Sequence, residues 1–180
     1  MLLPQDEPKR IVALFAEKIP EGKILDLGCN TGRNSLFLAK THLVDAVDKD
    51  EEALKLLKAK NKTITTHHQN IVDFAFKKKY AGIICTDTLH FLTLSDLTAL
   101  VEKMKKHTLA GGLNIITVFT KKGELVNPVF KHFFDPDELK QYYKDWEILT
   151  YTLKMADCHA KKPDGKPFQH ETAMLVARKL

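Results

Sequence analysis

Short continuous apolar runs alternate along the chain with stretches in which apolar residues recur every three or four positions. The short runs predict buried strands at residues 23–27, 43–48, 63–67, 80–86 and 113–119. The stretches between them predict amphipathic helices, because residues three and four apart lie on one helix face. Alternating strands and helices are typical of a parallel sheet, since parallel neighbours need crossover connections.

Three of the predicted helices have side chains suited to capping their first turn. A short polar side chain before an apolar helical run accepts a backbone N–H at the start of the helix. The predicted caps are Asp6, Asp50 and Ser95. Gly111-Gly112 is expected to end the helix that Ser95 begins, which is the third of these capped helices. The residues expected to face inward are Ile11, Leu14, Phe15 and Ile19 in the first helix, Leu54 and Leu57 in the second, and Leu97, Leu100, Val101 and Met104 in the third.

The last third of the chain follows a different pattern. Asp135-Pro136-Asp137-Glu138 predicts a helix start, with Asp135 as the cap and Pro136 at the first position. Two extended runs, 146–158 and 168–178, are joined by a turn-forming segment and predict an antiparallel hairpin. The sequence therefore predicts an α/β fold: a Rossmann-like, doubly wound sheet of seven strands, mostly parallel, with this hairpin at its end.

The loop after the first predicted strand contains Gly28 and Gly32. Glycine lets the backbone turn sharply and approach a ligand, and a helix that begins near Thr31 directs unpaired N–H groups at that place. We therefore predict a small polar ligand here. An ordinary turn between a strand and a helix has the same Gly-x-x-x-Gly spacing and stays open as an alternative.

Asp26 distinguishes this loop from a dinucleotide fingerprint, which reads Gly-x-Gly-x-x-Gly. A carboxylate before the first glycine would repel a pyrophosphate. It suits a ligand with an ammonium group, such as the methionine part of S-adenosyl-L-methionine.

Asp48 ends the second predicted strand and is our candidate for a contact with ribose hydroxyls. Asp45 and Asp50 are the competing candidates for this contact. The alternative for Asp45 is a strand-edge charge, and the alternative for Asp50 is a helix cap. We prefer Asp48 because open α/β sheets bind ligands at the carboxyl ends of their strands.

The chain has 180 residues, 44% of them hydrophobic, which suits one globular domain over residues 1–180. We expect no signal peptide and no membrane span, because the first residues include Asp6 and Glu7 and no apolar run reaches about 18 residues. Three scattered cysteines are typical of reduced thiols in a cytoplasm. We expect a cytoplasmic protein, and we predict no metal site because neighbouring His and Cys residues on a strand point to opposite faces.

The formal net charge of +5 raises the question of nucleic-acid binding. Lys77-Lys78-Lys79 lies between elements, and the cations at 103–107 end a helix, where they complement the helix dipole. No aromatic-rich basic motif accompanies them, so we interpret both groups as solvated faces and expect no nucleic-acid partner. A small anionic substrate remains compatible with this charge.

Asp26-x-Gly28-x-x-x-Gly32, Asp48 and the closing hairpin together resemble a class I S-adenosylmethionine-dependent methyltransferase. The likeness is closest to the tellurite-resistance (TehB-type) methyltransferases and covers the chain from about Asp6 to its end. Its most specific parts are Gly-Arg-Asn-Ser at 32–35 and Tyr-Tyr-x-x-Trp-Glu-Ile-Leu at 142–149, and the closing segment 173–179 is also similar.

The resemblance implies S-adenosyl-L-methionine as cofactor, S-adenosyl-L-homocysteine as product and a small methyl acceptor such as tellurite or selenite. Asp48 would hold the ribose, Asn70 and Ile71 would flank the adenine, and Thr86 would lie near the sulfonium. Asn30 stands where the family usually has Gly, and Asn tolerates a left-handed backbone. The full predicted cofactor set is Asp26, Gly28, Cys29, Asn30, Gly32, Asp48, Lys49, Asn70, Ile71 and Thr86.

Arg33, His90 and His159 are the candidates for contacting the acceptor. A chalcogen oxyanion would attack the methyl group with its own lone pair, so the protein must align it and hold its oxygens rather than supply a strong base. His159 rests on the resemblance, and Ala160 follows it where we expect Arg. Each candidate has a structural alternative: a helix-surface cation for Arg33, a packed imidazole for His90 and a strand residue for His159.

Other functions compete with methylation of an oxyanion. A nicotinamide oxidoreductase is disfavoured by the missing middle glycine and by the hairpin. Methylation of another small metabolite such as a thiol, and non-catalytic sensing of S-adenosylmethionine, fit the same residues and stay open.

Overall fold

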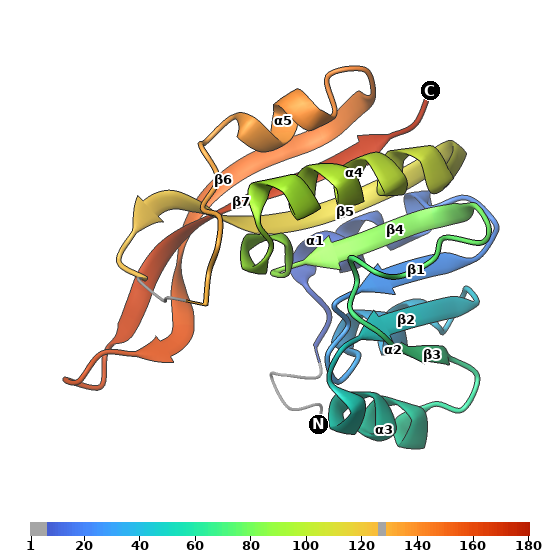
Figure 1. The fold of residues 1–180 in the computed structure, drawn as a ribbon, viewed down its shortest axis with the longest axis horizontal. Helices are drawn as coiled ribbons and strands as arrows, with labels where there is room; N and C mark the ends of the chain where they lie inside the picture. Colours follow the sequence, from blue (N-terminus) through green and yellow to red (C-terminus); the bar gives the residue numbers. More distant parts are fainter. Residues whose placement is uncertain (1–6, 126–128) are drawn as a thin grey trace.

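The computed structural model describes residues 7–125 and 129–180, and their strands form a seven-stranded sheet (Figure 1). Five strands are parallel, β7 pairs antiparallel with β5, and β6 pairs antiparallel with β7. The strand order is β3-β2-β1-β4-β5-β7-β6, which confirms the predicted fold class. The strands are β1 (Ile24–Leu27), β2 (Val44–Asp48), β3 (Thr65–His68), β4 (Tyr80–Thr86), β5 (Thr108–Gly123), β6 (Glu147–Lys161) and β7 (Pro167–Arg178).

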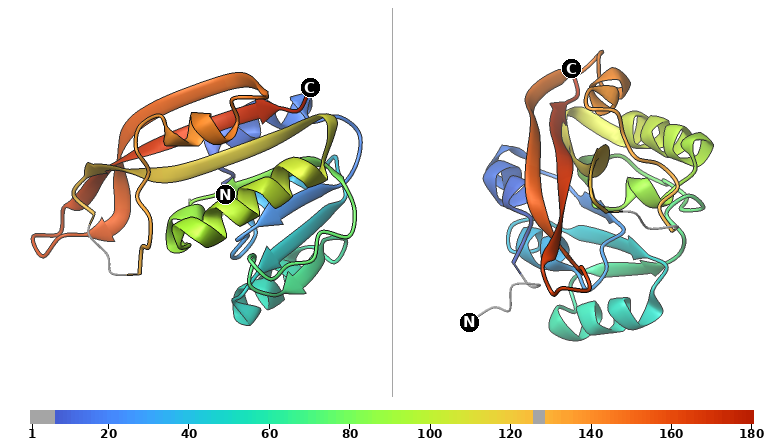
Figure 2. Two further views of the ribbon diagram at one scale, coloured as in Figure 1. Left: turned by 45° about the horizontal axis from the view of Figure 1, so that its top comes forward. Right: turned by 90° about the vertical axis from the view of Figure 1, so that its left-hand side faces the viewer.

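Helices cover both faces of this sheet (Figure 2). One face carries α1 (Arg10–Phe15) with its 3-10 extension η2 (Ala16–Lys18), together with α2 (Arg33–Leu38) and α3 (Glu51–Lys60). The other face carries α4 (Leu94–His107) and α5 (Glu138–Tyr142), and the 3-10 turn η3 (Leu89–Phe91) follows β4. In the described part of the chain, no helix is long and apolar enough to cross a bilayer.

The strand residues alternate between two apolar clusters, one on each face. In β1, Leu25 and Leu27 pack in the cluster that contains Leu100 of α4, and Ile24 packs in the cluster that contains Val12 of α1. All four residues of β1 are buried, as a parallel strand covered on both faces requires. This double burial fixes the direction in which the end of β1 points into the loop at 28–32.

The hairpin and the helix before it follow the prediction with one shift. Lys162 N–H donates to the Lys166 carbonyl (2.8 Å), closing the turn between β6 and β7, and the far ends of both strands extend past the rest of the sheet (Figure 1). α5 begins at Glu138 after Asp137, so Asp135 is not its N-cap. Glu138 Oε2 still accepts the Asp135 N–H (3.0 Å), which is the reciprocal half of a capping box.

Two predictions for the first helix differ from the structure: the residue at which the helix begins and the inward orientation of Leu14. α1 begins at Arg10, and Asp6 lies outside the described residues. Leu14 is 63% exposed, whereas Val12 is fully buried. Because Leu14 is about 200° around the helix from Val12, it points away from the face centred on Ile11 and Val12.

The predicted ends of α4 also differ from the structure. Thr93, not Ser95, is the N-cap, and its Oγ1 accepts the Asp96 N–H (3.2 Å). The helix ends at His107 because β5 already begins at Thr108, so Gly111 and Gly112 lie inside the strand. The pairing of β4 with β5 is irregular in this region, between Tyr80 and Gly82, which accommodates the two glycines.

Asp45 is not the strand-edge charge that the sequence indicated. It is 1% exposed, and its carboxylate contacts Lys23 Nζ (2.7 Å) and Lys78 Nζ (3.2 Å) and accepts the Tyr80 hydroxyl (3.2 Å). Burial raises the pKa of Asp45, but the hydrogen bonds and charges of the two lysines outweigh burial and hold it below its ordinary value. β2 therefore contains a buried ionised carboxylate that ties β1 and β4 to it.

We predict that Asp45→Asn lowers the free energy of unfolding at pH 7 by about 1–3 kcal/mol, because two lysines lose their buried partner. The folded pKa of Asp45 lies below the value of about 3.9 in an unfolded chain, so its contribution is present above that value and is lost as the pH falls through the folded pKa. Urea unfolding at pH 7 and pH 3 measures the difference. Glu52→Gln, in an exposed pair with Lys55, is the control, and an equal loss in both variants would contradict the prediction.

Candidate functional site

The carboxyl ends of β3, β2, β1 and β4 lie side by side and carry the predicted cofactor-binding residues. Parallel strands bring these ends to one edge of the sheet. The strand order reverses between β1 and β4, the position at which open α/β sheets place their ligands. The structure thus brings the residues predicted from four separate segments to one edge.

The loop after β1 has a left-handed backbone at three of its five residues. Gly28 has φ 71°, Asn30 has φ 50° and Gly32 has φ 85°. The expectation that Asn30 tolerates this conformation is confirmed. Such a path is costly for other residue types, which explains the composition of the loop.

Gly28 and Gly32 are in close contact with side chains from other parts of the protein, so neither position has space for a Cβ atom. A Cβ atom on Gly28 would overlap the side chain of Thr88, and one on Gly32 would overlap the end of Leu57 in α3. A larger side chain at position 28 would therefore meet Thr88 as well as any ligand that approaches the loop. Gly28 is required because the segment after β4 packs directly on the loop after β1.

Asp48 joins the loop after β1 to the start of α3. Its Oδ2 accepts the Asn30 N–H (2.7 Å), and its Oδ1 accepts the Asp50 N–H (2.9 Å). Asp50 is the N-cap of α3, as predicted, with its Oδ1 accepting the Ala53 N–H (3.0 Å). Each carboxylate oxygen of Asp48 keeps a second acceptor position, so a pair of hydroxyl donors can still bind.

Asp26 lies at 1% exposure below the loop, and its Oδ2 accepts the hydroxyl of Ser35 in α2 (2.6 Å). Burial raises the pKa of Asp26 to about 6, even though the Ser35 hydrogen bond and the charge of Arg33 act in the opposite direction. A carboxylate held in this state gains most from a nearby cationic group, because such a group offsets the cost of its buried charge.

The other predicted cofactor residues differ in exposure. Lys49 and Asn70 are exposed, whereas Ile71 is buried in the cluster on the α4 side. Thr86 is buried, and its Oγ1 accepts Nδ2 of Asn34 (3.0 Å). Cys29 is also buried, and burial raises the pKa of its thiol, so it is an uncharged packing residue.

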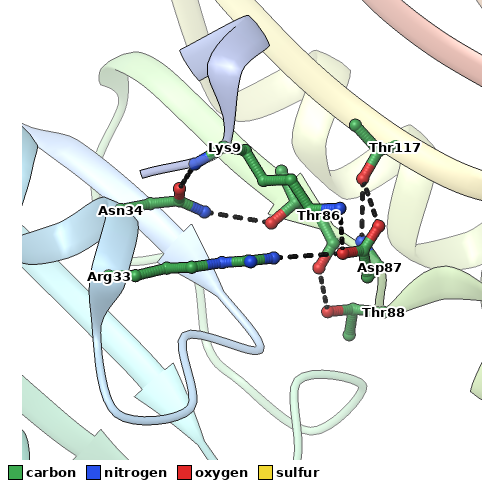
Figure 3. A network of polar contacts seen from close by, with 7 residues as sticks. All are labelled: Lys9, Arg33, Asn34, Thr86, Asp87, Thr88 and Thr117. Atoms are coloured by element: carbon green, nitrogen blue, oxygen red, sulfur yellow. Dashed lines mark hydrogen bonds and ion pairs between the residues drawn. The ribbon is translucent and has the colours of Figure 1, made fainter. Parts of the chain in front are cut away.

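Asp87 follows β4 and is the centre of a polar network that the sequence did not reveal (Figure 3). Its Oδ2 contacts Lys9 Nζ (2.5 Å) and Arg33 Nη2 (3.1 Å), and its Oδ1 accepts the Thr117 hydroxyl (2.7 Å). Burial raises the pKa of Asp87, but Lys9, Thr117 and Arg33 together hold it below its ordinary value. The signal that identified Asp48, an acidic residue at a strand end, applies equally to Asp87.

The three candidate acceptor contacts are in different situations. Arg33 begins α2, directly after the glycine loop, and is held by Asp87. His90 is 1% exposed and stacks on Phe119 with ring centroids 4.5 Å apart, and burial lowers its pKa to about 4. His90 is therefore a neutral, packed imidazole, which is the structural alternative to an acceptor contact. His159 lies in β6, and its side chain is outside the described residues.

A family model described as "Tellurite resistance protein TehB" matches residues 10–175. The chain belongs to the TehB family. It is 33% identical over 170 residues to the "Probable S-adenosyl-L-methionine-dependent methyltransferase TehB" of Haemophilus influenzae, over 91% of this chain and 59% of that protein. The resemblance noted from the loop and the hairpin is thereby confirmed.

Solved structures agree with this assignment. A crystal structure of TehB from Haemophilus influenzae superposes with a TM-score of 0.85 at 31% identity, over 94% of this chain and 61% of that one. A structure described as SAM-dependent methyltransferases, from Methanosarcina mazei, has a TM-score of 0.74 at 16% identity, over 97% and 99% of the two chains, and shows the shared fold. The chain spans about three fifths of the length of the TehB proteins it matches.

We predict that Gly28→Ala lowers the free energy of unfolding by about 1–3 kcal/mol more than Gly111→Ala, since only Gly28 meets a neighbour. Gly111 is a matched control because its φ of 74° is nearly that of Gly28 (71°), yet a Cβ atom added there would meet nothing within 4 Å. Denaturant unfolding of both variants measures the difference. Adding Thr88→Ala should recover part of the loss at position 28, and equal losses in the two single variants would contradict the contact.

We predict that Asp26→Asn raises the free energy of unfolding of this protein at pH 8 by on the order of 2 kcal/mol. The folded pKa of about 6 lies above the unfolded value, so the contribution of protonated Asp26 is fully present below about pH 4 and is lost as the pH rises through 6. Asn keeps an acceptor for Ser35 and removes this loss. Thermal unfolding at pH 4, 6 and 8 tests it, and a variant that is less stable than wild type at pH 8 would refute the burial argument.

Proposed function

We propose that this chain binds S-adenosyl-L-methionine at the carboxyl ends of β1, β2 and β4 and transfers its methyl group to a small acceptor. The observation that carries the proposal is the left-handed loop at 28–32, flanked by Asp26 and Asp48, in a chain of the TehB family. The name of the Haemophilus influenzae relative, a probable S-adenosyl-L-methionine-dependent methyltransferase, supports the same reaction.

Each acidic residue has a distinct part in the proposed binding. The free acceptor positions of Asp48 receive the two ribose hydroxyls while the carboxylate keeps its bonds to Asn30 and Asp50. Asp26 favours the ammonium group of the methionine part, because a cation offsets its buried charge. Asn70 and Ile71 flank the adenine at the end of β3, with Lys49 near the ribose and Thr86 near the sulfonium.

The acceptor that we propose is a chalcogen oxyanion of the tellurite or selenite type. A lone pair on the chalcogen forms the new bond to carbon as the sulfonium C–S bond breaks, and the bonding pair stays on sulfur. The protein contributes alignment and exclusion of water, and orientation alone is worth about 7–11 kcal/mol. Arg33 supplies positive charge at this edge, and His159 is retained as a contact on the family resemblance.

We also propose a cytoplasmic location. Cys29, Cys85 and Cys158 are free thiols in the structure, which is consistent with a reducing compartment.

The cofactor part of the proposal is tested by calorimetry with S-adenosyl-L-homocysteine. We expect wild type to bind, and Asp48→Ala to bind more weakly by about 1–3 kcal/mol, because two hydroxyls lose a charged acceptor. Glu52→Gln, on an exposed pair in α3, should bind like wild type. Binding of NAD in place of S-adenosyl-L-homocysteine would remove the proposed function.

The acceptor part is tested by a turnover screen. We expect formation of S-adenosyl-L-homocysteine with tellurite and selenite, and little with thiols or small amines. Turnover with thiols alone would replace the oxyanion by another acceptor. Tight cofactor binding without turnover on any acceptor would favour a sensor.

A further inference from the structure

Two cationic side chains from separate parts of the chain meet on one oxygen of Asp87. Lys9 precedes α1 and Arg33 begins α2, and both contact Oδ2, at 2.5 and 3.1 Å (Figure 3). The side chains are 30% exposed for Lys9, 28% for Arg33 and 26% for Asp87. The group is therefore partly exposed and lies at the edge of the sheet that the carboxyl ends of β1 and β4 form.

The main chain at Asp87 is held in an unusual conformation. Its φ is 54°, and apart from Asn30 in the ligand loop it is the one non-glycine residue with positive φ among residues 7–125 and 129–180. Its N–H donates to the Thr117 carbonyl (2.9 Å), and its Oδ1 accepts the Thr117 hydroxyl (2.7 Å). Strain that the surroundings maintain in this way is concentrated at functional sites.

Lys9 is fixed at both of its ends. Its backbone N–H donates to Oδ1 of Asn34 (2.9 Å), and Nδ2 of the same Asn34 donates to Oγ1 of Thr86 (3.0 Å). Its ammonium group is on Asp87. The residue is thus anchored to the start of α2 and, through Asn34, to Thr86 at the end of β4, the residue that the proposed function places near the sulfonium.

The charges of this group do not cancel. Within this group of three side chains, one carboxylate meets one ammonium and one guanidinium, so their formal charges sum to +1, and the charge of Arg33 also acts on the neighbouring Asp26. An ammonium has three donors and a guanidinium has five, and a single carboxylate oxygen engages few of them. The remaining donors and the excess charge match an oxyanion, which both groups bind strongly.

We propose that Lys9 and Arg33 form an anion-binding site at the switch between β1 and β4, with Asp87 as the positioning residue that holds both cations. The ligand is an oxyanion: either the carboxylate of the cofactor's methionine part or the chalcogen oxyanion acceptor. This inference rests on the proposed function and adds Lys9 and Asp87 to the site. Lys9 lies 17 positions before Asp26, the first residue of the predicted cofactor set.

The test is Lys9→Met, which removes the charge and keeps the apolar stem. Calorimetry compares S-adenosylmethionine with decarboxylated S-adenosylmethionine, and kinetics give KM and kcat for selenite. If the site holds the cofactor carboxylate, the variant should bind S-adenosylmethionine about tenfold more weakly and the decarboxylated analogue unchanged. If it holds the acceptor, the affinity for both cofactors should be unchanged and KM for selenite should rise about tenfold.

Three further variants separate this role from a structural one. Lys9→Arg should restore the affected constant, and Lys18→Met, which removes an exposed lysine at the end of the same helical segment, should change nothing. Asp87→Asn should alter the same constant as Lys9→Met and leave the other constant near wild type.

The inference would be overturned if Lys9→Met lowered the affinity for both cofactors equally, or if it changed none of the measured constants. In either case, binding and turnover by the wild-type protein would leave the proposed function intact. A wild-type protein that neither binds S-adenosylmethionine nor methylates selenite would remove the proposed function and this inference with it.

Discussion

The left-handed path of the loop at 28–32 is the constraint on which the ligand edge depends. The path brings the Asn30 N–H to Asp48, and it brings Gly28 against Thr88 and Gly32 against Leu57. Those contacts tie the loop after β1 to the ends of β2 and β4 and to α3. A right-handed residue at these positions would separate them, so the position of α2 and its Arg33 also follows from this path.

Three carboxylates stand at three neighbouring strand ends, and each has a different environment. Asp26 is buried with one hydroxyl donor and is costly to ionise, whereas Asp87 is kept ionised by two cations. Asp48 receives two backbone N–H groups at the surface. Asp26 and Asp87 thus differ in how costly their ionised forms are, because their surroundings differ. A site that keeps a carboxylate in an unfavourable place gives up stability there, which is a common feature of functional sites.

The sequence predicted most of what depends on local pattern. The bounds of β4, the cap at Asp50 and the left-handed tolerance of Asn30 each follow from neighbouring residues, and all are confirmed. Features that depend on distant partners were missed or wrong. Asp45 looked like an exposed charge because nothing near it in the chain reveals Lys23 and Lys78, and Lys9 gave no signal because its partner Asp87 is far away in sequence.

The place of β6 at the end of the sheet has a consequence for self-association. In the described chain no further strand pairs with its outer side, and Leu153 and Met155 on it are 42% and 40% exposed. A long edge strand with apolar side chains is a template for pairing with a second copy. Lys154 and Asp157 interrupt this stretch with charge, and the irregular pairing near Ile148 and Thr150 twists it. Charges and irregular pairing of this kind are the features by which edge strands of native proteins resist such pairing.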